Sequence, residues 1–98
     1  MKGILIEPGK APVVTTLPDT LQGIEAMLGC DCTQKVLPRT PAVLVYGLLG
    51  KGLNRIYRGQ NIYGTILCYG WKNNSLVPMS KDLQAEMLDR LKETEVRV

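Results

Sequence analysis

Histidine is absent from this 98-residue chain, and cysteine occurs only three times. Without histidine the chain cannot form a Ser-His-Asp or Cys-His catalytic set, nor a zinc site that uses histidine ligands. Cys30 and Cys32 are close together and Cys68 is remote, so the three thiols cannot all pair or supply the four ligands of a cysteine-only zinc site. We therefore expect reduced, mostly buried cysteines and neither a metal nor a cofactor; a redox or metal role is the alternative.

Long apolar runs are also absent, and none approaches the roughly 20 residues that a membrane-spanning helix requires. Near the N-terminus, Glu7 and Pro8 interrupt the short apolar stretch before the core of a signal peptide could form. Hydrophobic residues make up 45% of the chain, which is typical of a folded domain and too high for a disordered segment. We expect one compact domain, residues 1–98, located in the cytoplasm and without a membrane partner.

Carboxylates are missing from the middle of the chain. Residues 32–81, the basic segment, contain no Asp or Glu and carry a net charge of +7, whereas residues 1–31 and residues 82–98 each carry −2. The cations of the basic segment are Lys35, Arg39, Lys51, Arg55, Arg58, Lys72 and Lys81. A long stretch with charge of one sign favours an anionic partner.

The basic segment also contains all five aromatic residues, which are Tyr46, Tyr57, Tyr63, Tyr69 and Trp71, and six of the ten glycines. Flat rings stack on bases, and glycines let backbone amides approach a phosphate closely. The combination predicts a surface for a nucleotide or a polynucleotide. In the alternative interpretation, the tyrosines fill the core of a sheet and the cations face only water.

Apolar alternation and β-branched stretches, separated by turn residues, predict an α+β fold. We expect a mixed or mostly antiparallel sheet with two helices, in the order β-β-α-β-β-β-α. Asp19 is the predicted N-cap of the first helix, Gly29 ends it, and Ser80 caps the second helix. The predicted strands cover residues 3–7, 11–17, 33–37, 42–49 and 62–69.

Residues 50–55 are predicted to form a loop that can hold a phosphate. Backbone amides beside Gly50 and Gly52 would bind it together with the side chains of Lys51 and Arg55. The Walker spacing is missing, which excludes an ordinary ATPase or GTPase. Two further polar loops, at 58–61 and 72–75, can lie at the same end of the sheet if the strands pair as hairpins; alternatively, they serve only as turns.

No catalytic set of residues is visible in the sequence. Glu7 and Asp31 are isolated acids without an evident partner, and Ser75 and Ser80 have no base nearby in sequence. We therefore expect a binding protein and not an enzyme.

Several motifs point to one family: Glu7-Pro8-Gly9-Lys10 near the start, Leu53-Asn54-Arg55 in the middle, Ile62-x-Gly64-Thr65 after it, and a terminal helix led by Ser80. Over nearly its full length the chain resembles the domain-of-unknown-function family number 3846, which occurs in phages and in integrated or conjugative elements. The resemblance supplies no catalytic residues. It implies a mobile-element context, in which small accessory proteins often counter host defences.

Our leading hypothesis is an anti-defence accessory protein of a phage or mobile element that binds an anionic nucleotide signal without catalysis and so lowers its free concentration. A homo-oligomer is expected, because such ligands are often held between subunits. A nucleic-acid-binding module and an inhibitor that docks on a host protein are the alternatives. The candidate ligand-binding residues are Lys51, Asn54, Arg55, Tyr57, Arg58, Tyr63 and Trp71.

Overall fold

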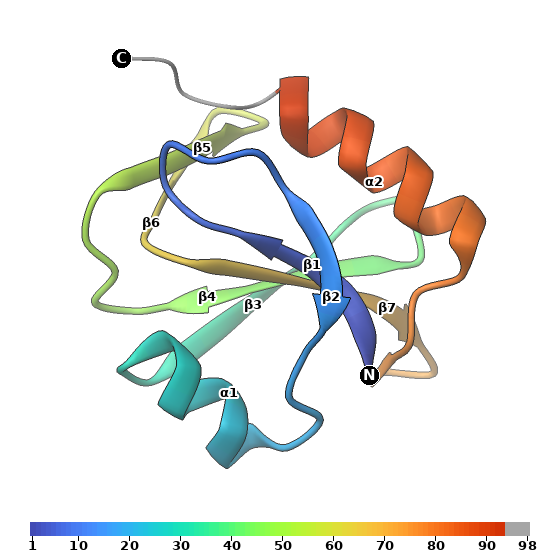
Figure 1. Ribbon diagram of the computed structural model, residues 1–98, viewed down its shortest axis with the longest axis horizontal. Helices are drawn as coiled ribbons and strands as arrows, with labels where there is room; N and C mark the ends of the chain where they lie inside the picture. The colour runs from blue at the N-terminus through green and yellow to red at the C-terminus, as the bar shows by residue number, and fades with distance from the viewer. Residues whose placement is uncertain (94–98) are drawn as a thin grey trace.

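The computed structural model describes residues 1–93 and has an α+β architecture, as the sequence predicts (Figure 1). Its helices are α1 (Leu21–Leu28) and α2 (Lys81–Glu93). Its strands are β1 (Lys2–Ile6), β2 (Val13–Thr16), β3 (Cys32–Val36), β4 (Ala42–Gly47), β5 (Leu53–Tyr57), β6 (Gln60–Tyr63), β7 (Ile66–Lys72) and β8 (Ser75–Val77). The predicted order of elements is confirmed, and short strands are added to it. Part of the predicted loop 50–55 belongs to β5, and the predicted strand 62–69 is divided at Gly64 and Thr65 between β6 and β7.

The larger sheet is antiparallel and has the strand order β2-β1-β7-β4-β3. Beyond the end of β1, β8 pairs with the last part of β7. The two most apolar strands, β4 and β7, lie in the centre because both of their faces are covered, and a strand of that kind needs no polar side. Strands β5 and β6 form a separate hairpin.

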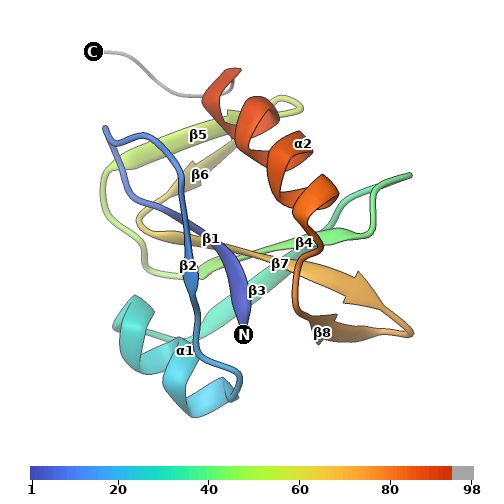
Figure 2. The same cartoon turned by 45° about the vertical axis from the view of Figure 1, so that its right-hand side comes forward.

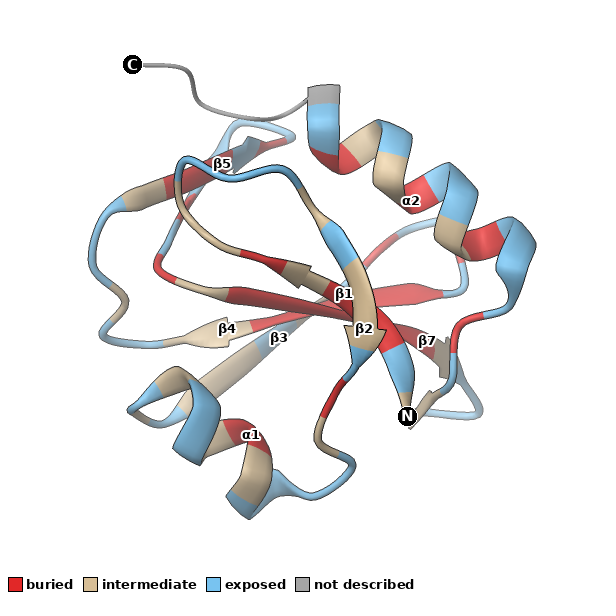
Figure 3. Cartoon of the chain, viewed as in Figure 1, coloured by how far each residue is buried: buried red, intermediate tan, exposed pale blue. Residues whose placement is uncertain are grey.

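The two faces of the large sheet are covered by different elements, which gives three layers (Figures 1 and 2). On one face, Ile4, Leu44 and Cys68 pack with α2 and with the β5–β6 hairpin. On the other face, Val43 and Leu67 pack with α1. Neighbouring strand residues alternate between these two clusters, as the period of two in a β-strand requires, and the buried residues of Figure 3 follow β1, β4 and β7.

The helix ends follow the predicted chemistry, with one correction. Gly29 adopts a φ of 77° and ends α1 with a hydrogen bond from its N–H to the Glu25 carbonyl, and Ser80 accepts a hydrogen bond from the Leu83 N–H at 3.2 Å. The prediction that Asp19 caps α1 is wrong, because the extended residue before the first helical turn is Thr20. Its hydroxyl accepts from the Gly23 N–H at 3.1 Å.

The polar loops of the basic segment do not share one end of the sheet. The β5–β6 hairpin precedes the start of β7, whereas the turn at Asn73 and Asn74 follows the end of β7. Figure 2 accordingly places β5 and β8 on opposite sides of the molecule. The hypothesis that the loops meet at one end is therefore wrong. Between residues 1 and 93, neither helix has the length and apolar character needed to cross a bilayer.

Gly50 lets the β4–β5 connection pass against the end of β6. A Cβ atom at this position would lie 2.2 Å from the Tyr63 carbonyl oxygen, which is backbone and cannot rotate away. We predict that Gly50→Ala lowers the free energy of unfolding by about 1 to 3 kcal/mol through overpacking. Chemical denaturation is the measurement. Ala11→Gly, at an exposed position outside the helices and strands, is the control for a small change of backbone freedom; equal losses for both variants would contradict the steric explanation.

Candidate functional site

Arg55 lies in the protein interior with only 1% of its surface exposed. Its Nε donates a hydrogen bond to the Leu91 carbonyl at 2.8 Å, and its Nη2 donates to the Lys10 carbonyl at 3.1 Å. Its Nη1 donates to both oxygens of Asn54, the backbone one at 2.9 Å and the side-chain one at 2.8 Å. The guanidinium therefore joins β5 to the last turn of α2 and to the β1–β2 connection. The carbonyl end of a helix carries partial negative charge, which favours a cation there.

Asn54 is fully buried and connects the hairpin to the large sheet. Its Nδ2 donates hydrogen bonds to the Ile6 carbonyl at 2.9 Å and to the Gly64 carbonyl at 2.6 Å. Asn54 and Arg55 are consecutive, and a bulge between Leu53 and Arg55 turns both side chains inward. The structure thus corrects the assignment of these two residues to a ligand site, because their polar atoms are engaged inside the protein.

The aromatic side chains of the basic segment do not form a common ring-lined hollow. Tyr57 and Tyr69 are buried, and the Tyr69 hydroxyl donates a hydrogen bond to the Pro18 carbonyl at 2.6 Å. Trp71 is half-buried on the face that carries α1, near the end of β7 that lies away from the hairpin. Tyr63 is 46% exposed. Tyr57 and Trp71 are thus removed from the candidate site, the first by burial and the second by its position.

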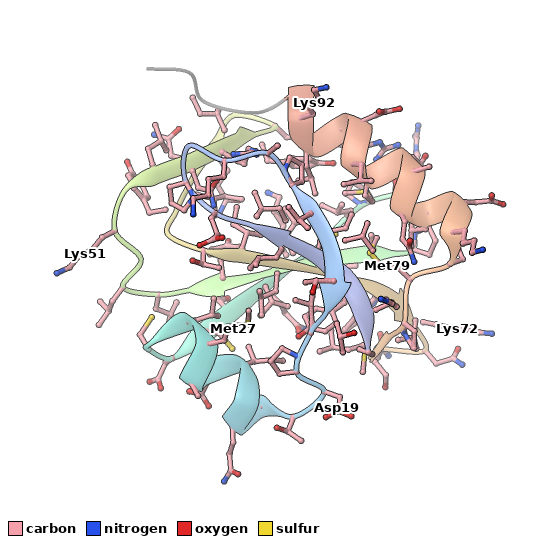
Figure 4. All side chains as sticks on the ribbon, viewed as in Figure 1. Asp19, Met27, Lys51, Lys72, Met79 and Lys92 are labelled. Carbon is pink, nitrogen blue, oxygen red and sulfur yellow. The ribbon has the colours of Figure 1, made fainter. Side chains whose placement is uncertain are left out.

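Lys51, Arg58 and Tyr63, the remaining candidates, are exposed on or beside the β5–β6 hairpin. Figure 4 shows the Lys51 side chain extending away from the molecule. Large apolar side chains are exposed in the same region, and Leu49 reaches 78% exposure. We define the outer hairpin surface as the exposed side chains of Leu48, Leu49, Lys51, Ile56, Arg58, Asn61 and Tyr63.

The pairing of the hairpin places three of these side chains on one face. Ile56 is directly opposite Asn61, and Tyr63 follows Asn61 by two residues, so the three project from the same face. Gly50 lies close to the Tyr63 carbonyl, so the chain that carries Leu49 and Lys51 passes beside the end of β6. The Leu48 N–H bonds to the Asp31 carbonyl at 2.8 Å, at the start of this connection. No carboxylate belongs to the outer hairpin surface.

A second surface feature is a shallow cavity of about 430 Å³ on α2. Its lining includes the carboxylates of Asp82 and Glu86, together with Ser80, Leu83 and Pro41. These carboxylates would repel a phosphate, so the cavity does not suit the anionic ligand that the sequence predicts.

The three cysteines are free. Cys68 is buried, but Cys30 and Cys32 are half-buried, so the expectation that the cysteines are mostly buried is wrong. Burial raises the pKa of the Cys68 thiol to about 12, which keeps it protonated and unreactive. Within residues 1–93, the side chains described include no group of three or more acidic, histidine or cysteine residues placed to hold a metal ion.

Four members of this surface are absent from the seven candidates: Leu48, Leu49, Ile56 and Asn61. The two leucines end a continuous apolar run, which predicts that they belong to the central strand. Ile56 is hard to recognise as an exposed residue from the sequence of β5. In this strand the polar residues Asn54 and Arg55 face inward and the apolar Ile56 faces outward, the reverse of the usual pattern. A signal was present in the leucines themselves, since two apolar residues directly before a Gly-Lys-Gly turn are poorly placed for burial.

The family model described as a domain of unknown function (DUF3846) matches residues 1–92. No curated protein matches the chain, and no solved structure does.

The first prediction from this site concerns the buried polar network. Asn54→Ala removes the donor for the carbonyls of Ile6 and Gly64 and one acceptor of Arg55. We expect the free energy of unfolding to fall by about 2 to 4 kcal/mol, because buried polar groups lose their partners. The matched control is Asn61→Ala on the exposed face of the same hairpin, for which we expect a change within about 0.5 kcal/mol. Urea denaturation measures both, and similar losses would contradict the structural role of Asn54.

The second prediction concerns alkaline pH. Burial, with contributions from the charges of Asp19 and Cys32, raises the pKa of Tyr69 from 10 to about 12. As the pH rises, the Tyr69 phenol loses its proton at lower pH in the unfolded chain than in the folded one. The free energy of unfolding is therefore retained below pH 10 and falls as the pH rises towards 12. In this range unfolding releases about one extra proton. Tyr69→Phe should remove this part of the pH dependence, and Tyr63→Phe, at an exposed ring, should not. Denaturation at several pH values tests this, and an unchanged slope in Tyr69→Phe would contradict it.

Proposed function

The chain belongs to the DUF3846 family, a domain of unknown function, and we propose that it is an accessory protein of a phage or mobile element that acts by docking on a partner protein, without catalysis. The observation that carries the proposal is the outer hairpin surface. It combines four large apolar side chains, all at least 45% exposed, with two cations and no acid.

The composition of this surface fits a protein interface better than a nucleotide site. Protein interfaces have an apolar centre enriched in aromatic and Arg residues, with polar groups at the rim. Leu49, Ile56 and Tyr63 would supply the centre, and Lys51 and Arg58 would lie at the edge. The positive rim favours an acidic partner surface, because opposite charges speed association and disfavour wrong partners.

Nucleotide capture, the leading hypothesis from the sequence, has less support from the geometry. Among its seven candidate residues, Asn54, Arg55 and Tyr57 are buried. Lys51 and Arg58 lie on either side of β5, whose five residues span about 16 Å at 3.3 Å per residue. Cations spread along a strand in this way suit an extended partner surface better than a small enclosed ligand.

The test compares the wild-type protein with Leu49→Asp and Tyr63→Ala as baits in a nuclease-treated lysate of the organism that carries the gene. We expect the wild-type protein to retain a partner, and each variant to bind it at least tenfold more weakly, because truncation of a central interface residue costs about 2 kcal/mol. Leu21→Asp is the matched control, since Leu21 is 62% exposed on α1, away from the hairpin. It should retain the partner, and circular dichroism verifies the fold of every variant.

The same proteins are titrated calorimetrically with cyclic and ADP-ribose-type nucleotides and with single-stranded DNA at several salt concentrations. Micromolar binding of a nucleotide that Leu49→Asp leaves unchanged would overturn the docking proposal in favour of nucleotide capture. DNA binding that weakens steeply with salt would overturn it in favour of a nucleic-acid module, because counterion release produces that dependence. Equal retention of the partner by Leu49→Asp and the wild-type protein would also overturn it.

A further inference from the structure

The large sheet ends at β2, and no strand lies beyond β2 in residues 1–93. Figure 1 looks towards this edge, where β2 passes in front of β1. The strand is Val13-Val14-Thr15-Thr16, which is β-branched and uncharged. Uncharged β-branched edges pair readily with another strand, because their backbone groups are free and no charge opposes the contact.

The backbone groups that point away from the sheet can be identified. Leu17 and Met1 exchange two hydrogen bonds, of 2.7 and 2.8 Å, and so form a hydrogen-bonded pair. Since such pairs alternate along an antiparallel ladder, Thr15 also pairs in this way with Gly3, and Val13 with Leu5. The N–H and C=O groups of Val14 and Thr16 therefore point outward from the edge.

We propose that β2 pairs antiparallel with β2 of a second copy of this chain, so that the two large sheets become continuous across a twofold axis. In this arrangement Val14 of each copy is opposite Thr16 of the other, and the outward groups make four hydrogen bonds. The axis passes between the two Thr15 residues, which form a close non-hydrogen-bonded pair of the kind that stabilises sheets.

The sequence around Thr15 is symmetric in a way that suits this register. Pro12 and Pro18 each lie three residues from Thr15, and since proline has no N–H, they limit the pairing to the five residues between them. Beyond the prolines, Lys10 lies on one flank and Asp19 on the other. Antiparallel pairing brings the lysine flank of each copy alongside the aspartate flank of its partner, so the charges of the two copies are complementary.

The β2 edge also exposes apolar surface. Val13 is 56% exposed although it lies in a strand. In the proposed pair it lies opposite Leu17 of the second copy, whose own side chain is buried, so the second strand covers part of the Val13 apolar surface. The main helix contacts are to other strands, since α1 packs against β3 and β4, and α2 packs against β1.

The opposite edge of the sheet, β3, differs in charge. Lys35 lies in β3, and its Nζ donates to the Gln60 side chain at 2.6 Å. A second copy paired along β3 would bring like charges together, which disfavours pairing. Because one edge of each copy is used and the twofold contact closes on itself, the expected assembly is a dimer and not a fibre.

Sedimentation velocity of the full chain between about 10 µM and about 1 mM tests the proposal, a range chosen because a pair of five-residue strands is smaller than a standard interface. We expect a reversible monomer–dimer equilibrium within this range. Thr16→Pro removes an N–H that points away from the sheet and keeps the hydrogen bonds between β2 and β1. An edge strand tolerates proline at such a position. The dissociation constant of the dimer should rise at least tenfold. Thr15→Lys keeps every backbone group, places two lysines opposite each other at the axis, and should have the same effect.

The matched control is Val36→Pro in β3. Like Thr16, Val36 directly precedes a Leu-Pro pair. Its N–H also points away from the neighbouring strand, because the adjacent pair of Leu37 and Ala42 is hydrogen-bonded. This variant should dimerise as the wild-type protein does. A wild-type protein that is monomeric at every concentration would overturn the proposal. The proposal would also fail if Thr16→Pro and Thr15→Lys are folded and dimerise with the dissociation constant of the wild-type protein. Loss of the dimer in Val36→Pro as well would overturn the assignment to β2.

Discussion

Arg55 is a cation held inside the protein, and carbonyl oxygens from separate parts of the chain surround its guanidinium. Burial of a charge is costly unless polar groups surround it, so the position of this side chain follows from where its acceptors lie. Leu91 supplies one acceptor from the last turn of α2, Lys10 supplies one from the β1–β2 connection, and Asn54 supplies two from β5. The network therefore fixes the hairpin against the sheet and the final helix at the same time, and the outer hairpin surface depends on it for a defined orientation.

The family motifs acquire a structural meaning through the same network. Glu7-Pro8-Gly9-Lys10 and Asn54-Arg55 are far apart in sequence, yet Asn54 donates to the Ile6 carbonyl just before the first motif and Arg55 donates to its last residue. Hydrogen bonds to the main chain thus link the two motifs and hold the β1–β2 connection against β5. The exposed residues of the outer hairpin surface belong to neither motif.

The sequence predicts the fold far better than the site, because helices and strands depend on local patterns whereas the site depends on tertiary packing. Strands such as β4 and helices such as α2 follow from apolar periodicity and from caps, which are local properties. In β5 the usual rule is reversed, because Asn54 and Arg55 face inward and Ile56 faces outward. A cation in a polar stretch looks like a ligand residue in sequence, and only the positions of Leu91 and Lys10, which are set by tertiary packing, reveal that Arg55 is structural. The seven candidates also include Trp71, which is close to the hairpin in sequence but is carried away from it along β7.

The bond between Arg55 and the Leu91 carbonyl has a consequence for synthesis on the ribosome. When the nascent chain has emerged as far as the end of β7, it contains every strand of the large sheet except β8. It still lacks α2, the helix that supplies this acceptor. Until α2 has left the exit tunnel, water must solvate that side of the guanidinium, and the hairpin cannot close over it at low free energy. The outer hairpin surface therefore reaches its final orientation only after α2 has supplied this acceptor.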